Sequence, residues 1–196
     1  MSKYLTGLMV LILLLLCALF LRLEQQENQK PLALHSFSLP DIQGKIQDSQ
    51  QWQGTIRVIN FWATWCPSCL TEIPFFIRLQ TKYQAQGVQF IGIAVDNPQS
   101  VDEYLDFTPI NYPILLASTG GTKLAKQLGN NVSAIPYTAI VDKNNQIIFR
   151  HAGELSEQTL EKQLSQLFAK DKLSIDPIPE QKIGLKQAVL SLTPAK

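Results

Sequence analysis

Hydrophobic residues follow strand and helix spacing along most of the chain, and their pattern predicts a protein that alternates the two kinds of element. Residues 55–62 and 88–95 are apolar runs of strand length, and the second is rich enough in β-branched residues to indicate a fully buried parallel strand. Residues 70–86 between them carry apolar side chains at helical spacing, and Pro74 is predicted to kink that helix. The order strand, helix, strand requires a right-handed crossover.

Shorter periodic segments complete the predicted fold. They indicate an N-terminal hairpin at residues 37–39 and 45–47, helices at 99–107, 122–128 and 156–168, a strand at 114–117, and a second hairpin at 137–141 and 146–151. Asp96, which ends a buried strand ahead of Pro98, is predicted to cap the next helix. The simplest closure is an α/β fold with a mixed central sheet and helices on both faces.

The pattern predicts four parts in the chain. Residues 1–23 are predicted to be a transmembrane anchor, because residues 5–21 carry no charge and are long enough to cross a bilayer as a helix. Residues 24–32 are polar and are predicted to be a linker, and residues 33–170 form the folded domain. The pattern predicts no structure for the C-terminal extension, residues 171–196.

A cleaved signal peptide is the alternative interpretation of the N-terminal segment. Signal peptides have a shorter apolar core followed by a small-x-small cleavage site, whereas Leu19-Phe20-Leu21-Arg22 follows here. Cys17 is interpreted as a bilayer-facing thiol and not as a lipid attachment site, because Leu16 stands where lipoprotein processing requires a small side chain. Positive charges on both sides of the segment leave its orientation undecided.

Charge and cysteine content exclude two classes of protein. The 17 Lys and Arg residues balance 16 Asp and Glu residues without a dense basic run, so no nucleic-acid partner is expected. Three cysteines are too few for a disulfide scaffold. With Cys17 in the apolar segment, only Cys66 and Cys69 are placed to pair.

The candidate chemistry lies in Trp65-Cys66-Pro67-Ser68-Cys69, where a predicted strand gives way to a helix. This junction places Cys66 at a helix N-terminus, among unpaired backbone amides that stabilise a thiolate, so Cys66 is the predicted nucleophile. Cys69 lies one helical turn further and is predicted to resolve the mixed disulfide by closing a disulfide with Cys66.

Other uses of the two thiols stay open from the residues alone. A zinc site would need two more ligands, and His35 and His151 do not form a ligand-spaced pair, so no metal and no cofactor are expected. A copper or haem delivery module would use the thiols as transient soft ligands. A redox-inert docking domain would keep them permanently oxidised, and a disulfide-forming oxidase would run the exchange in the opposite direction.

The same residues resemble the thioredoxin superfamily, and within it the membrane-anchored periplasmic thiol:disulfide oxidoreductases of the TlpA/ResA-like kind, which are related to cytochrome-c-maturation reductases. The resemblance covers residues 34–168. It is carried by Asn60-Phe61-Trp62-Ala63-Thr64-Trp65-Cys66-Pro67-Ser68-Cys69, Glu72, Pro74, Ile135-Pro136 and residues 150–155. A peroxiredoxin is disfavoured, because Ala63 stands where that class needs a Thr.

The resemblance implies a thioredoxin-like fold and further site residues. Pro136 is expected to be cis and to expose the backbone of Ile135 for strand-like pairing with an extended substrate, whereas the residues alone favour a trans turn. Trp65 and Pro67 are expected to contact the substrate at the edge of the active site.

Two positions depart from the patterns of related groups. Asn60 stands where cytosolic thioredoxins carry a buried Asp, so Glu72 becomes the candidate proton acceptor for the resolving thiol. The alternative for Glu72 is a solvated carboxylate in the first turn of a helix. Tyr137 stands where cytochrome-maturation reductases tend to carry an acidic residue after the cis-proline.

The resemblance also implies partners and a location. The substrate is expected to be a protein disulfide, in apocytochrome c or another extracytoplasmic protein, and a membrane electron donor is expected to recharge the thiols. The chain is expected to be a single-pass protein of the bacterial inner membrane, with its catalytic domain on the periplasmic side.

Overall fold

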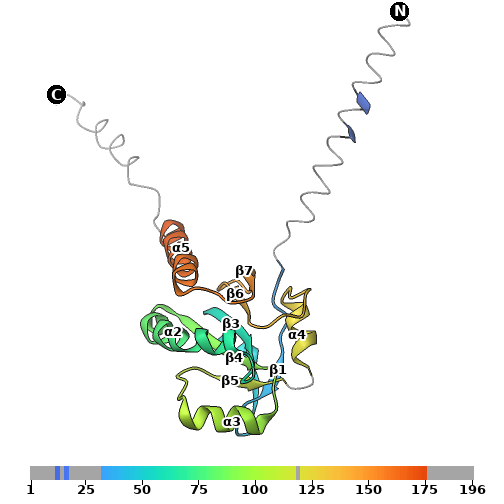
Figure 1. Ribbon diagram of the computed structural model, residues 1–196. Coiled ribbons are helices and arrows are strands. Elements are labelled where there is room, and N and C mark those ends of the chain that lie inside the picture. The colour runs from blue at the N-terminus through green and yellow to red at the C-terminus, as the bar shows by residue number, and fades with distance from the viewer. Residues whose placement is uncertain (1–11, 14–15, 18–31, 118–119, 176–196) are drawn as a thin grey trace, which may run out of the picture. The chain divides into compact units, whose positions relative to one another are not determined.

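Figure 1 shows a computed structural model of the chain, which describes residues 12–13, 16–17, 32–117 and 120–175. The chain consists of two compact units, Met1–Glu157 and Gln158–Lys196. No helix within the described residues is long and apolar enough to cross a membrane. The predicted anchor lies outside them apart from residues 12–13 and 16–17, as does most of the C-terminal extension.

A five-stranded mixed sheet forms the centre of the first unit, in the order β5-β4-β3-β6-β7. Its strands are β3 (Ile56–Trp62), β4 (Val88–Ala94), β5 (Ile114–Leu116), β6 (Tyr137–Val141) and β7 (Ile147–Ala152). β3, β4 and β5 are parallel, β6 pairs antiparallel with β3, and β7 pairs antiparallel with β6. The predicted mixed sheet is therefore confirmed, with each strand within one or two residues of its predicted bounds.

The predicted N-terminal hairpin is a small sheet of its own. β1 (Ser38–Pro40) pairs antiparallel with β2 (Ile46–Asp48), and a single bridge from Asp41 to Leu115 ties the hairpin to β5. A 3-10 turn, η1 (Ser49–Trp52), follows β2 and was not predicted. Its sequence signal is Asp48, whose carboxylate accepts a hydrogen bond of 2.8 Å from the Gln50 amide as a cap.

The helices of the structure are α2 (Pro67–Tyr83), α3 (Pro98–Phe107), α4 (Gly121–Gln127) and α5 (Glu157–Ile175), with a 3-10 turn, η2 (Gln84–Gln86), after α2. Pro74 lies inside α2, which continues past it. α5 extends seven residues beyond the predicted end at residue 168, to Ile175. A helix begins at Pro98 as expected, but Asn97 caps it and not Asp96, since the Asn97 side chain accepts from the Ser100 amide at 2.8 Å.

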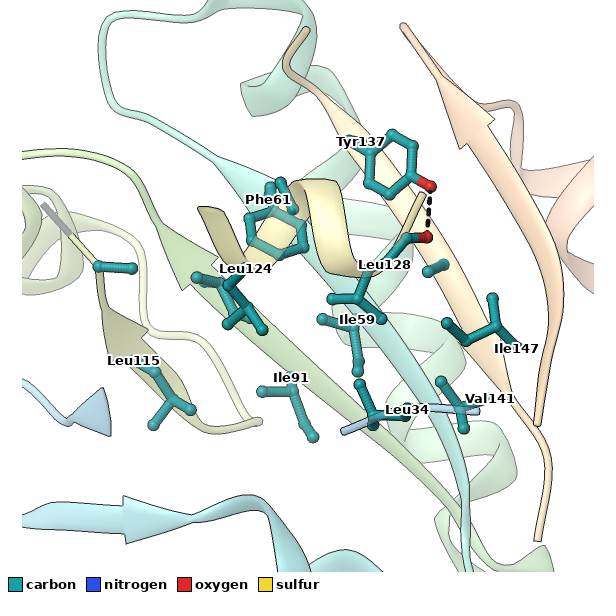
Figure 2. Packing of buried hydrophobic residues seen from close by; sticks show 14 residues of the cluster. Leu34, Ile59, Phe61, Ile91, Leu115, Leu124, Leu128, Tyr137, Val141 and Ile147 are labelled. Atoms are coloured by element: carbon teal, nitrogen blue, oxygen red, sulfur yellow. Dashed lines mark hydrogen bonds between the residues drawn. The ribbon is translucent and has the colours of Figure 1, made fainter. Parts of the chain in front are cut away.

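Helices cover both faces of the sheet. Ile59 and Phe61 of β3 face α4 and meet Leu124 and Leu128 there, in a cluster of buried apolar residues that Figure 2 shows. The buried members are Leu34, Ile59, Phe61, Ile91, Ile93, Leu115, Ala117, Leu124, Ala125, Leu128, Tyr137, Ala139, Val141 and Ile147. Adjacent strand residues point to opposite faces, so Asn60 and Trp62 point away from this cluster.

The opposite face of the sheet carries α2 and α3. The ring of Phe76 in α2 lies 5.6 Å from that of Phe90 in β4, and Trp62 of β3 lies 5.5 Å from Tyr104 of α3, measured between centroids. The chain leaves β3 at Trp62 and enters α2 at Pro67. Residues 63–66 therefore form a short connection at the end of a strand that is buried along its whole length.

We expect Ile59→Ala to destabilise the protein by about 2–5 kcal/mol, because it opens a cavity in the fully buried centre of β3. Ile46→Ala is the matched control, since Ile46 is also in a strand but is 62% exposed, and we expect it to change the free energy of unfolding by less than about 0.5 kcal/mol. Urea unfolding measures both. Equal losses in the two variants would contradict this assignment of the core.

Candidate active site

Cys66 is the N-cap residue of α2, as the sequence predicted. Pro67 occupies the first helical turn, and the Cys69 amide donates to the Cys66 sulfur at 3.3 Å. A disulfide joins Cys66 to Cys69, with their Cα atoms 5.3 Å apart. The amide that binds the sulfur of Cys66 in this state is positioned to stabilise a thiolate when the disulfide opens.

The two cysteines differ in accessibility. Cys69 is completely buried, whereas Cys66 retains 5% of its surface and lies between the exposed residues Trp65 and Pro67. Trp65 is 66% exposed, an unusual degree for a tryptophan. Of the two cysteines only Cys66 retains exposed surface, which fits the predicted roles of nucleophile and resolving thiol.

The Ile135–Pro136 peptide bond is cis, which confirms the expectation taken from the resemblance over the trans turn that the residues alone favoured. It stands directly before β6, where Tyr137 pairs with Phe61 of β3. Ile135 and Trp65 line one pocket of about 100 Å³ together with Phe61, Val95 and Ala125. The structure thus brings the cis-proline loop and the cysteine loop to the same end of the sheet.

Asn130 holds the turn that leads into the cis-proline, and the sequence analysis missed it. Its side-chain amide donates to the Ala134 carbonyl at 2.7 Å and accepts from the Ala134 amide at 3.3 Å. Asn130 is buried, and Ser133 within this turn has a φ of 53°, in the left-handed region. The available sequence signal was an Asn directly after Gly129, but its burial and its partner Ala134 are visible only in the folded loop.

Asp96 fixes the loop that precedes the cysteines. Its carboxylate accepts from the Thr64 amide at 2.9 Å and from the Thr64 hydroxyl at 2.6 Å. The prediction that Asp96 caps the next helix was wrong, because the loop after β3 offers it a backbone donor and a hydroxyl while Asn97 takes the cap. Asp96 is therefore a positioning residue for the segment that carries Trp65 and Cys66.

Glu72 is completely buried, so the alternative of a solvated first-turn carboxylate is wrong. Its Oε1 accepts from the Leu155 amide at 2.6 Å and its Oε2 from the Asn60 side-chain amide at 3.2 Å, and Asn60 also donates to the Thr138 hydroxyl at 3.1 Å. Within the described part of the chain, neither cysteine sulfur hydrogen-bonds to Glu72. Glu72 lies one helical turn beyond Cys69, on a neighbouring position of the same helix face.

Burial raises the pKa of Glu72 from 4.5 to about 7, because the charged carboxylate loses its hydration. The hydrogen bonds from Leu155 and Asn60 lower the pKa of Glu72 but do not offset the desolvation, and the nearby charge of Glu154 raises the pKa further. A carboxyl group with a pKa near neutrality exchanges protons readily at physiological pH.

No group of three or more His, Cys, Asp or Glu side chains that could hold a metal ion occurs among the described residues. His151 places its Nε2 within 3.0 Å of the Glu154 carbonyl. The chemistry that this arrangement supports is thiol-disulfide exchange, with a partly exposed cysteine, a completely buried one and a buried carboxyl group one turn further along the same helix.

Known proteins are similar to this chain in sequence. The Redoxin family model matches residues 27–166. The thiol-disulfide oxidoreductase ResA of Bacillus thuringiensis subsp. konkukian is 27% identical over 168 residues, covering 81% of this chain and 94% of that protein. ResA of Halalkalibacterium halodurans is 28% identical over 127 residues, covering 64% and 70%.

Two solved structures share the fold. A thiol:disulfide interchange protein of the thioredoxin family from Chlorobium tepidum TLS superposes with a TM-score of 0.63 at 26% identity, over 70% of this chain and 97% of that one. StoA from Bacillus subtilis superposes with a TM-score of 0.55 at 22% identity, over 67% and 98%. The fold is therefore the thioredoxin-like α/β fold that the resemblance implied.

We expect the stability of the oxidised protein to fall between about pH 4.5 and 7 in a way that depends on Glu72. Its pKa is higher in the folded state than in the unfolded chain, so the contribution is complete below about 4.5 and is lost as pH rises through about 7. The loss is on the order of 3 kcal/mol. Glu72→Gln removes the titration while keeping an acceptor for Leu155. Urea unfolding at pH 5, 6, 7 and 8 compares the two proteins, and parallel pH profiles would contradict the expectation.

Proposed function

The chain belongs to the Redoxin family, and from that premise we propose that it is a membrane-tethered thiol-disulfide oxidoreductase that reduces protein disulfides outside the cytoplasm. The observation that carries the proposal is the asymmetry of the cysteine pair. Cys66 keeps 5% of its surface exposed beside the exposed Trp65, and Cys69, one turn further along α2, is completely buried. A nucleophile and a resolving thiol need this difference, whereas a structural disulfide does not.

The reaction proceeds in two exchanges. The Cys66 thiolate attacks one sulfur of the substrate disulfide, the substrate bond breaks, and the departing substrate thiolate takes a proton from water. Cys69 then loses its proton and attacks the Cys66 sulfur, which releases the second substrate sulfur as a thiolate that is protonated in turn. Two electrons pass to the substrate, and the product is the Cys66–Cys69 disulfide that the structure contains.

Glu72 is the proposed proton acceptor for Cys69 in the second exchange. Its burial and its pKa of about 7 suit a group that takes a proton from a thiol and returns it to solvent. It takes the place of the buried Asp of cytosolic thioredoxins, where this chain has Asn60. Asn60 itself acts through its hydrogen bond to the Glu72 carboxylate, as a positioning residue.

Substrate contacts are proposed at the edge formed by Trp65, Pro67 and the cis-proline loop. The backbone of Ile135 would pair with an extended substrate segment, and Trp65 would lie against its side chains. Tyr137, the residue after the cis-proline, is buried and donates its hydroxyl to the Leu128 carbonyl at 2.8 Å. It offers the substrate no charge at the position where cytochrome-maturation reductases tend to carry an acidic side chain.

The location and the partners are proposed from the resemblance and from the apolar sequence within residues 1–23. We propose that these residues anchor the chain as a single span in the inner membrane of a bacterium and that the catalytic domain faces the periplasm. A reductase in an oxidising compartment needs a supply of electrons, which we assign to a membrane electron-donor protein. The client is a protein disulfide, and apocytochrome c is one candidate.

We expect Cys69→Ser to accumulate a mixed disulfide with a disulfide substrate such as insulin, because the first exchange still occurs and the second cannot. Cys66→Ser should form none, since the remaining sulfur is buried. Non-reducing gel electrophoresis and mass spectrometry measure the adduct. Adducts of equal yield in both variants would contradict the assigned roles.

The direction of the reaction is tested by the reduction potential of the Cys66–Cys69 pair in the full-length protein, measured by equilibration with dithiothreitol or glutathione. A reductase is expected near thioredoxin's value of about −270 mV. A value near about −120 mV would show an oxidant that forms disulfides, and would overturn the proposed direction.

A further inference from the structure

Residues 153–155, the turn after β7, connect the cis-proline loop to α2. The Gly153 amide donates to the Pro136 carbonyl at 2.8 Å. The Leu155 amide donates to Glu72 Oε1 at 2.6 Å. The carboxylate of Glu154, between Gly153 and Leu155, lies 3.0 Å from the Thr71 hydroxyl and shares its single proton with the Ser68 carbonyl at 2.8 Å. One short turn therefore binds both the cis-proline and the buried carboxyl group.

The contacts between α2 and the turn are made by two consecutive residues of each. Thr71 and Glu72 of α2 meet Glu154 and Leu155 of the turn, so an exposed carboxylate is held next to a buried one. The Leu155 amide and the Glu154 carboxylate shift the pKa of Glu72 in opposite directions. The Leu155 amide favours the charged form of Glu72 by donating to it, and the negative charge of Glu154 disfavours it.

We propose that Glu154 is a positioning residue that moves the pH range in which Glu72 accepts a proton, because the turn that binds Glu72 holds the negative charge of Glu154 beside that carboxyl group. This role deepens the proposed function, since it rests on Glu72 as the proton acceptor for Cys69. Near neutral pH the buried carboxyl group is partly ionised, so the charge of Glu154 changes the fraction that is available as a base.

Among the described residues, Glu154 is the charged group whose field acts on Glu72. From β3 and β6 it faces Asn60 and, through Asn60, the hydroxyl of Thr138, which are both neutral. Tyr112, from the segment before β5, is protonated, because burial raises its pKa well above the usual range. The cysteines do not titrate in the disulfide, and His151 contacts the turn at the Glu154 carbonyl.

Electrostatic and structural roles of Glu154 are separated by two variants. Glu154→Gln removes the charge and keeps a side-chain oxygen that can accept from Thr71. Thr71→Val removes the hydrogen bond and keeps the charge on Glu154, and both positions are exposed. Neither residue touches the substrate or the sulfurs in the proposed mechanism.

The measurement is the titration of the Glu72 side-chain carboxyl by ¹³C NMR in the full-length oxidised protein, with Glu72→Gln to assign the signal. We expect Glu154→Gln to lower the pKa of Glu72 below its wild-type value, and Thr71→Val to leave it nearer that value. Added salt should also lower the pKa in the wild type, because it screens the Glu154 charge, and should have less effect in Glu154→Gln.

An unchanged Glu72 titration in Glu154→Gln would overturn the inference, as would an equal change in Thr71→Val, which would show that the turn acts by its position and not by its charge. Because the oxidised protein is titrated without substrate, the result does not depend on reductase activity. A protein that fails to reduce insulin but shows the expected shift would reject the proposed function and keep the Glu154–Glu72 coupling.

Discussion

The burial of β3 on both faces is the constraint on which the rest of the structure depends. β3 is hydrogen-bonded to β4 on one side and β6 on the other, and all of its residues are buried. Alternate side chains must therefore satisfy two different environments. Ile59 and Phe61 complete an apolar cluster with α4, while Asn60 is directed to the side of α2 and needs polar partners there.

Those partners form a chain of buried polar groups across the domain. Thr138 of β6, Asn60 of β3, Glu72 of α2 and the Leu155 amide are joined in sequence by hydrogen bonds. Breaking the chain would leave a polar group without a partner in the interior, which costs about 1–3 kcal/mol. The same contacts place a carboxyl group with a pKa of about 7 one helical turn from the resolving cysteine, so structural satisfaction and the proposed proton transfer use one set of bonds.

The cysteine loop is held from several directions although it is only a few residues long. Asp96, at the end of β4, binds Thr64, and the helix that starts at Pro67 supplies the amide that contacts the Cys66 sulfur. The cis-proline loop on the neighbouring strand is held in turn by Asn130 and by Gly153. A site fixed on rigid strand ends can present one sulfur to a partner while keeping the other buried.

The sequence by itself determined the strands and the helix that begins after Cys66, and it predicted the roles of the two cysteines, because periodicity, helix capping and the C-x-x-C spacing are properties of neighbouring residues. It indicated the cis-proline only through the resemblance. Tertiary structure alone decided that Glu72 is buried, that Asp96 binds a loop instead of capping a helix, and that Asn130 and residues 153–155 support the site. Each of these depends on partners from distant parts of the chain, such as Leu155 for Glu72 and Thr64 for Asp96, and the environment of a polar side chain is set by whatever the fold brings beside it.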